Sequence, residues 1–111
     1  MATTARFVPI SGEEELATWR ARSAEGPVLL FKHDPGCSIS EVAYRELARL
    51  DGEFPLIDVA RAKPLSLAVA AETGVRHESP QVILFRDGAV AWSASHFKIT
   101  AAAVRDALGI A

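Results

Sequence analysis

Five short apolar runs along the chain predict the strands of one sheet. Each run has the length of a strand and ends at turn-forming residues such as glycine, proline or aspartate. The Asp87-Gly88 pair between the last two runs is a strong β-hairpin signal. The predicted strands cover residues 7–8, 28–32, 54–59, 81–85 and 89–93.

Two helices are predicted in the first half of the chain, where apolar residues recur at helical spacing. Ser11 and Glu14 predict a capping box, with Ser11 as N-cap, for a helix over residues 13–22. A second helix begins at Cys37 and continues to a stop at Asp51-Gly52.

Two further helices are predicted in the second half. Pro64 suits the first turn of one of them, and Gly74 ends it. Thr100 can cap the last helix. The apolar positions expected along the four helices are Leu16, Ala17, Trp19 and Ala21; Ile39, Val42, Ala43, Leu47 and Leu50; Leu65, Leu67, Ala68 and Ala71; and Val104, Ala107 and Leu108.

The elements follow in the order βαβαβαββα, which combines parallel right-handed crossovers with a terminal hairpin. This is the order of a thioredoxin-like α/β fold, in which helices flank a mixed central sheet. The chain has 111 residues, of which 50% are hydrophobic, so it has room for one modest core. We therefore expect residues 1–111 to form a single thioredoxin-like domain.

The net charge and the single cysteine argue against some classes of function and constrain any redox mechanism. The formal net charge of -2 gives no overall attraction to nucleic acid or to an anionic membrane. No apolar stretch approaches the roughly 20 residues of a spanning helix, and residues 1–10 lack the hydrophobic centre of a signal peptide. A cytoplasmic location is therefore expected. Because the chain has one cysteine, any redox cycle must pass through a mixed disulfide that an outside thiol resolves.

That cysteine, Cys37, lies where a buried strand turns into a helix. The turn Asp34-Pro35-Gly36 stops the strand, so Cys37 falls in the first helical turn. A thiol there faces unpaired backbone N–H groups and the positive end of the helix dipole, and both favour the nucleophilic thiolate. Ser40 lies three residues on, on the same helix face, where its hydroxyl could donate a hydrogen bond to the sulfur. The motif is thus C-x-x-S, with an alcohol in place of a resolving thiol.

Two observations argue against a reactive Cys37. A lone cysteine is often a small buried hydrophobe, and the nearby carboxylate of Asp34 would disfavour the thiolate. The position of Cys37 in a polar, glycine-containing turn favours the reactive interpretation.

The predicted topology brings separated segments to the Cys37 edge of the sheet. Strand 28–32 ends there, and the next antiparallel strand starts there, so His33, Ser79-Pro80 and Ser95-His96 share this edge with Cys37. Ser79-Pro80 is a candidate for a cis peptide bond, the alternative being an ordinary trans proline at a strand start. Other residues expected at or near this edge are His77 and four cationic residues, Arg61, Lys63, Arg76 and Lys98, which could attract an anionic thiol substrate.

Four short motifs in this order resemble the monothiol bacilliredoxin family of thioredoxin-like proteins. The resemblance runs in register from about residue 31 to the C-terminus. Two positions depart from the family pattern, because Ser38 stands where proline is common and Phe97 where tryptophan is common. The motifs are Lys32-His33, Cys37-x-Ile39-Ser40, His77-Glu78-Ser79-Pro80-Gln81-Val82 and Ser95-His96-x-x-Ile99-Thr100.

The resemblance implies a thioredoxin fold, a nucleophile at Cys37 and a cis proline at Pro80. It also implies the removal of bacillithiol, a low-molecular-weight thiol co-substrate, from S-thiolated protein partners. Combined with the residues, this assigns catalysis to Cys37 and Ser40, and substrate binding to Ser79, Pro80, His33 and His96. Either histidine could instead be a structural residue that a backbone carbonyl satisfies.

Two other functions remain open at this point. The chain could be a non-catalytic thioredoxin-like module that binds partner proteins through the Ser79-Pro80 edge. A metal site built from Cys37 and the three histidines matches no short ligand motif, so we expect neither a metal nor another cofactor. The oligomeric state cannot be inferred from these patterns.

Overall fold

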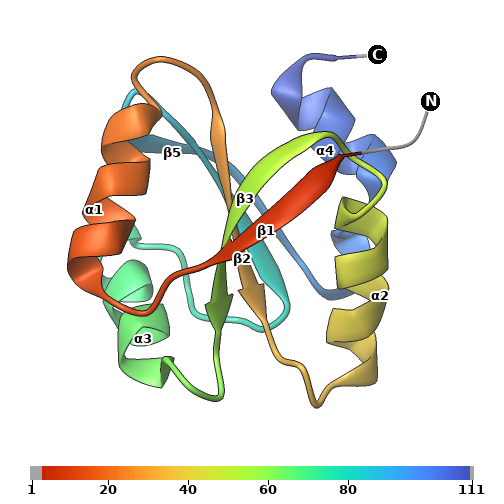
Figure 1. The fold of residues 1–111 in the computed structure, drawn as a ribbon, viewed down its shortest axis with the longest axis horizontal. Helices are drawn as coiled ribbons and strands as arrows, with labels where there is room; N and C mark the ends of the chain where they lie inside the picture. The colour runs from red at the N-terminus through yellow and green to blue at the C-terminus, as the bar shows by residue number, and fades with distance from the viewer. Residues whose placement is uncertain (1–3, 111) are drawn as a thin grey trace.

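The computed structural model describes residues 4–110, which form a five-stranded sheet with helices on both faces (Figure 1). The strands are β1 (Ala5–Pro9), β2 (Val28–His33), β3 (Gly52–Asp58), β4 (Gln81–Arg86) and β5 (Ala89–Ser95). They lie in the order β1-β3-β2-β4-β5. β1, β3 and β2 run parallel, and β4 pairs antiparallel with both β2 and β5. Residues 1–3 and 111 of the predicted domain lie outside the described residues.

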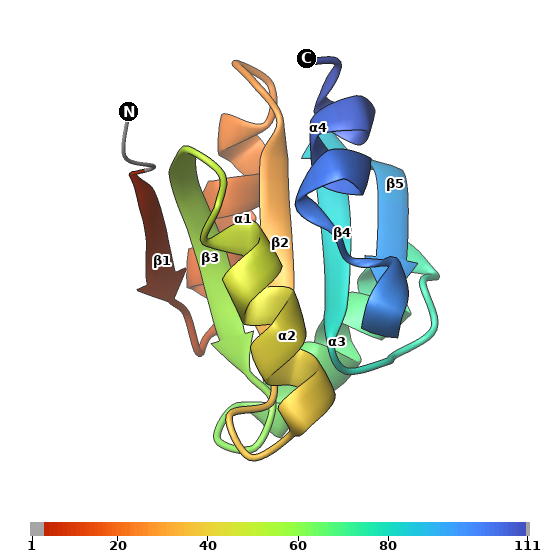
Figure 2. The same cartoon turned by 90° about the vertical axis from the view of Figure 1, so that its right-hand side faces the viewer.

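Helices cover the two faces of this sheet in pairs. They are α1 (Glu13–Arg22), α2 (Ser38–Leu47), α3 (Lys63–Thr73) and α4 (Ala101–Leu108), with a 3-10 turn, η1 (His96–Lys98), before α4. One face carries α1 and α3, and the other carries α2 and α4 (Figures 1 and 2). The predicted order βαβαβαββα and the predicted mixed sheet between helices are confirmed.

The central strand β2 divides the core into two parts. Leu29 and Phe31 pack against α2 and α4, and Val28 and Leu30 pack against α1 and α3. A strand that is buried on both faces reads as a continuous apolar run, which explains why the sequence predicted this strand well. Lys32 and His33 interrupt the apolar pattern at the end of β2, and both are nevertheless buried.

The start of α1 differs from the prediction by one residue. Gly12 is the N-cap, and Glu15, at the third helical position, accepts N–H bonds from Gly12 (3.1 Å) and Ser11 (3.0 Å). The predicted box of Ser11 and Glu14 is therefore wrong. The three successive glutamates at residues 13–15 made the register ambiguous, because any of them could supply the carboxylate. The predicted bounds of α1 are confirmed.

The inward faces of α2 and α3 are also rotated from the prediction. Val42 and Leu67, expected in the core, are 45% and 49% exposed. The predicted positions Ala43, Leu47 and Leu65 are buried, and Ser40, Ser66 and Val69 are buried in addition. Hydrophobic spacing does not predict buried serines: Ser40 is held by hydrogen bonds, and Ser66 Oγ has no hydrogen-bond partner among the described residues.

The remaining turns follow the expected chemistry. Asp87 and Gly88 have φ of 52° and 77°, as a two-residue hairpin turn between β4 and β5 requires. Thr100 Oγ1 accepts the N–H of Ala103 at 3.0 Å and caps α4 as predicted. Gly74 ends α3 in the left-handed region with φ of 73°. Within residues 4–110, no helix has the length and apolar composition needed to cross a bilayer.

Candidate active site

One edge of the sheet collects the segments that the sequence placed around Cys37. β2 ends at this edge with His33, and the turn that follows leads to the first residues of α2 (Figure 1). β4 begins at the same edge, immediately after the Ser79-Pro80 bond, which is cis as predicted. The hairpin returns β5 there, and the N–H of His96 donates to the carbonyl of Pro80 at 3.0 Å. The edge thus joins three segments that lie far apart in sequence.

Cys37 is the N-cap residue of α2 and is a half-buried free thiol. Its backbone is extended, with φ of -111° and ψ of 126°, as an N-cap residue requires. Its N–H donates to the carbonyl of Asp34 (3.0 Å), and its carbonyl accepts the N–H of Glu41 (3.1 Å). The backbone of Cys37 is therefore fixed at both ends, at the position whose side chain can accept hydrogen bonds from the first turn of a helix.

The Asp34 carboxylate accepts a hydrogen bond within the turn before Cys37. Asp34 Oδ1 accepts the N–H of Gly36 at 3.1 Å, a local bond that closes the turn before Cys37. The N–H of Asp34 donates to Ser40 Oγ at 2.8 Å. Asp34 thus organises the loop between β2 and α2 through its side chain and its backbone.

Ser40 is fully buried and is joined to His33. Ser40 Oγ lies 2.7 Å from His33 Nδ1. On the other side of the ring, His33 Nε2 lies 3.7 Å from a carboxylate oxygen of Glu41, which favours the tautomer that carries its proton on Nε2. Nδ1 then accepts the hydroxyl hydrogen of Ser40, so the two hydrogen bonds of this hydroxyl lead to His33 and Asp34. The expected hydrogen bond from the Ser40 hydroxyl to the Cys37 sulfur stays a prediction. It would require the hydroxyl hydrogen to turn away from His33 Nδ1.

His33 is held neutral at this position. Burial lowers the pKa of His33, and the nearby carboxylates of Glu41, Asp58 and Asp34 oppose that shift only in part. A neutral imidazole can accept the hydroxyl hydrogen of Ser40, as the tautomer above requires. The His33 carbonyl also accepts the N–H of Val59 at 2.9 Å, which ties the end of β2 to the segment after β3.

We predict that Ser40→Ala lowers the free energy of unfolding by about 1–3 kcal/mol, because the N–H of Asp34 and Nδ1 of His33 lose a buried partner. Urea denaturation at neutral pH measures the change. Ser38→Ala is the matched control, because Ser38 is exposed in the same first turn, and it is expected to change the stability by less than about 0.5 kcal/mol. Equal stabilities of the two variants would contradict this role of Ser40.

A second, partly buried histidine contact involves Lys32, to which the sequence motifs assigned no role. The Lys32 residue is 0% exposed, and its Nζ lies 3.2 Å from His77 Nδ1. Burial lowers the pKa of Lys32 to about 8. The sequence does carry a signal for this burial: Lys32 alternates with Val28 and Leu30, so its side chain lies on the same inward face of the central strand.

His96 lies on the other side of the cis proline and has an unusual backbone. Its φ is 55°, a left-handed conformation that is uncommon for residues other than glycine and that clusters at functional sites. His96 Nδ1 lies 4.0 Å from Glu78 Oε2. A hydrogen bond with Ser95 lowers the pKa of Glu78, and the charge of His96 adds to this effect. Next to His96, the aromatic side chain of Phe97 is 68% exposed.

The predicted cationic residues are all exposed on segments near this edge. Arg61 precedes α3, Lys63 begins it, Arg76 precedes the cis proline, and Lys98 ends η1. Within residues 4–110, no group of three His, Cys, Asp or Glu side chains is arranged to hold a metal ion.

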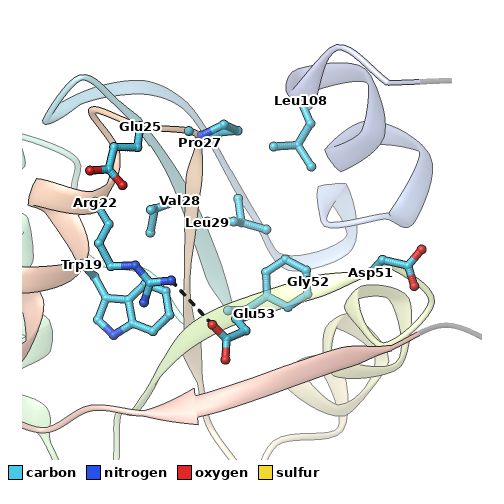
Figure 3. A pocket seen from close by; sticks show the side chains of 12 residues that line it. Trp19, Arg22, Glu25, Pro27, Val28, Leu29, Asp51, Gly52, Glu53 and Leu108 are labelled. Atoms are coloured by element: carbon cyan, nitrogen blue, oxygen red, sulfur yellow. Dashed lines mark ion pairs between the residues drawn. The ribbon is translucent and has the colours of Figure 1, made fainter.

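A separate hollow opens at the opposite edge of the sheet, where β2 and β3 begin (Figure 3). It is crossed by an ion pair between Arg22 and Glu53 (3.5 Å), and the guanidinium of Arg22 lies 4.1 Å from the ring centre of Trp19. None of the residues that line this hollow is a cysteine or a histidine. This hollow therefore lies apart from Cys37 and the three histidines.

Comparison with known proteins agrees with this geometry. The family model described as "Monothiol bacilliredoxin BrxC" matches residues 8–104. A solved structure described as an oxidoreductase candidate with a thioredoxin fold is 26% identical, with a TM-score of 0.82 over 91% of this chain and 92% of that chain. A thioredoxin mutant from Halobacterium salinarum NRC-1 is 20% identical, with a TM-score of 0.70 over 97% and 92% of the two chains. Thioredoxin F from spinach chloroplast is 19% identical, with a TM-score of 0.67 over 98% and 96%. The thioredoxin fold expected from the element order is confirmed.

Proposed function

Since the chain belongs to the monothiol bacilliredoxin family, we propose that it removes bacillithiol from S-thiolated proteins through a mixed disulfide on Cys37. The family and the thioredoxin fold support thiol-disulfide exchange as the general reaction. The observation that carries the proposal is the position of the chain's single thiol at the N-cap of α2, at the edge where β4 begins after a cis proline.

The proposed reaction balances with one thiol and one outside reductant. The Cys37 thiolate attacks the bacillithiol sulfur of the mixed disulfide, and a new S–S bond joins Cys37 to bacillithiol. The old S–S bond breaks, and the substrate protein leaves as a thiolate that takes a proton from solvent. A second bacillithiol thiolate then attacks the sulfur that is bound to Cys37. This step releases oxidised bacillithiol and restores the Cys37 thiolate.

Ser79 and Pro80 are the proposed contacts for the substrate, because they precede β4 at the Cys37 edge. The hydroxyl oxygen of Ser79 is buried and has no hydrogen-bond partner in the described part of the chain, which leaves its hydrogen-bonding capacity unsatisfied. His96 is proposed to bind substrate on the side of η1, where it is partly exposed beside Pro80. His33 is assigned to this site through Ser40, which it holds against the turn before Cys37.

A competition between small thiols tests the proposed substrate. One test protein carries bacillithiol on its cysteine, and a second preparation of the same protein carries glutathione. We expect the reduced chain to release the protein thiol faster from the bacillithiol adduct. Equal or faster release from the glutathione adduct would retain thiol-disulfide exchange but contradict bacillithiol as the preferred thiol.

A further inference from the structure

The exchange chemistry on Cys37 leaves one buried charge at the same edge unexplained. Lys32 lies at the end of β2 on the side of α1 and α3, in phase with Leu30 of the same core. Its hydrogen-bond partner among the described side chains is His77, at 3.2 Å. None of the ion pairs within residues 4–110 joins Lys32 to a carboxylate. Buried lysines without a counter-ion are rare, because burial disfavours the ammonium form.

His77 does not neutralise this charge. An ammonium can only donate, so His77 Nδ1 accepts from Lys32 and the ring proton lies on Nε2. Burial lowers the pKa of His77, and the charges of Lys32 and Lys63 lower it further, so the ring stays neutral. Lys32 thus fixes the tautomer of His77, which is left with an Nε2–H donor.

The neighbouring polar atoms are also unsatisfied. Gln81 is the cross-strand neighbour of Lys32 in the pairing of β2 with β4 and is 3% exposed. Its amide nitrogen donates to the carbonyl of Arg76 at 2.9 Å, but its Oε1 has no partner among the described residues. Ser79 Oγ is buried without a partner as well. Native proteins rarely leave such atoms unpaired unless a ligand or water completes them.

We propose that Lys32, Lys63, His77 and Ser79 form a carboxylate-recognition site for the low-molecular-weight thiol whose sulfur is exchanged on Cys37. Lys63 and the Nε2–H of His77 bind the carboxylate, and the Ser79 hydroxyl binds a polar group next to it. Lys32 is a positioning residue, because it orients the His77 ring. Its positive charge lies on the Nδ1 side of that ring, opposite the Nε2–H that binds the carboxylate. The proposal rests on the exchange function above and adds the residues that would recognise a carboxylate of the small thiol.

Mixed disulfides of matched chain length and different charge test this site directly. One test protein is joined in turn to 3-mercaptopropionate, 2-mercaptoethanol and cysteamine, which share a two-carbon chain and end in a carboxylate, a hydroxyl or an ammonium. The kcat/KM for release of the protein thiol is measured with each. The diagnostic quantity is the ratio of the carboxylate to the ammonium substrate, and each variant is compared with the wild type so that intrinsic differences in reactivity cancel.

The expected result is a change of preference in Lys32→Met but not in its charge-matched control. In Lys32→Met the ratio falls about fivefold, because a buried positive charge close to the carboxylate is lost. Arg6→Met is the matched control with the same change in net charge. Arg6 is exposed and paired with Glu53 at 3.7 Å, near the start of β3 at the opposite edge, and its variant should keep the wild-type ratio.

A second pair of variants tests the same site independently, in case Lys32→Met does not fold. His77→Ala removes the Nε2–H donor and should also lower the ratio, and His77→Gln, which keeps an N–H donor, should retain more of it. An unchanged ratio in Lys32→Met and His77→Ala, with all three substrates still released, would overturn the carboxylate site and leave the exchange function intact. Failure of the wild type to release any of the three would also overturn the carboxylate site, and the bacillithiol adduct of the same test protein would then show separately whether the exchange function holds.

Discussion

Cys37→Ser is expected to reduce the release of small thiols from S-thiolated proteins to the uncatalysed rate. Cys37 is the chain's single cysteine, so the variant has no sulfur on which a mixed disulfide can form. The serine should keep the fold, because Cys37 is only half-buried at the N-cap of α2, a position at which serine is among the preferred residues. The release of the protein thiol, measured over time with wild type and variant, gives the comparison.

A variant with its thiol at a neighbouring position tests whether exchange requires a thiol at residue 37 or any thiol in the first turn of α2. The double variant Cys37→Ser, Ser38→Cys keeps one thiol but moves it from the N-cap to the first residue of α2. Release by this variant should lie far below the wild type, because the sulfur no longer lies at the N-cap and next to the proposed Ser79 contact. Activity of Cys37→Ser close to the wild type would contradict the exchange mechanism. Tight binding of partner proteins by Cys37→Ser, without any turnover by the wild type, would favour a binding module instead.

Lys32→Met is expected to stabilise the fold at neutral pH by roughly 1–4 kcal/mol, since it replaces a buried charge with an apolar side chain of similar length. Burial lowers the pKa of Lys32 from 10.5 to about 8 in the folded protein. Between these two pH values the unfolded chain holds a proton that the folded chain has lost. The free energy of unfolding of the wild type should therefore rise with pH across this window.

The variant lacks that rise, so its advantage over the wild type should shrink from about pH 8 towards pH 10.5. Denaturant unfolding of both proteins provides the difference curve across this window, which lies above the titration of His77, whose lowered pKa also depends on Lys32. Lys98→Met is the control, because Lys98 is exposed at the end of η1, and it should give a flat difference curve. A flat curve for Lys32→Met as well would contradict a lowered pKa of Lys32.

The sequence predicted the parts of this fold that depend on local chemistry. The continuous apolar run of β2, the Asp87-Gly88 hairpin and the Thr100 cap each follow from a few adjacent residues. The place of Cys37 at the start of α2 followed from the turn before it. These predictions succeeded because backbone geometry at turns and caps is decided by the residues within them.

The contacts of the site could not be predicted in the same way. The sequence did not predict that the Ser40 hydroxyl contacts His33, at the end of β2, and the N–H of Asp34, in the turn that follows. The contact of Lys32 with His77 joins residues 45 positions apart. Such contacts depend on side-chain rotamers and on packing between elements, which hydrophobic spacing does not encode.

The most direct measurement is the intact mass of the reduced chain at early times after mixing with a bacillithiolated test protein. We expect a wild-type species heavier by one bacillithiol, the appearance of free test-protein thiol at the same rate, and no such species for Cys37→Ser. Fragmentation should place the added mass on Cys37. A disulfide between Cys37 and the test protein itself, or release of the test-protein thiol without any adduct on Cys37, would contradict the proposed attack on the small-thiol sulfur.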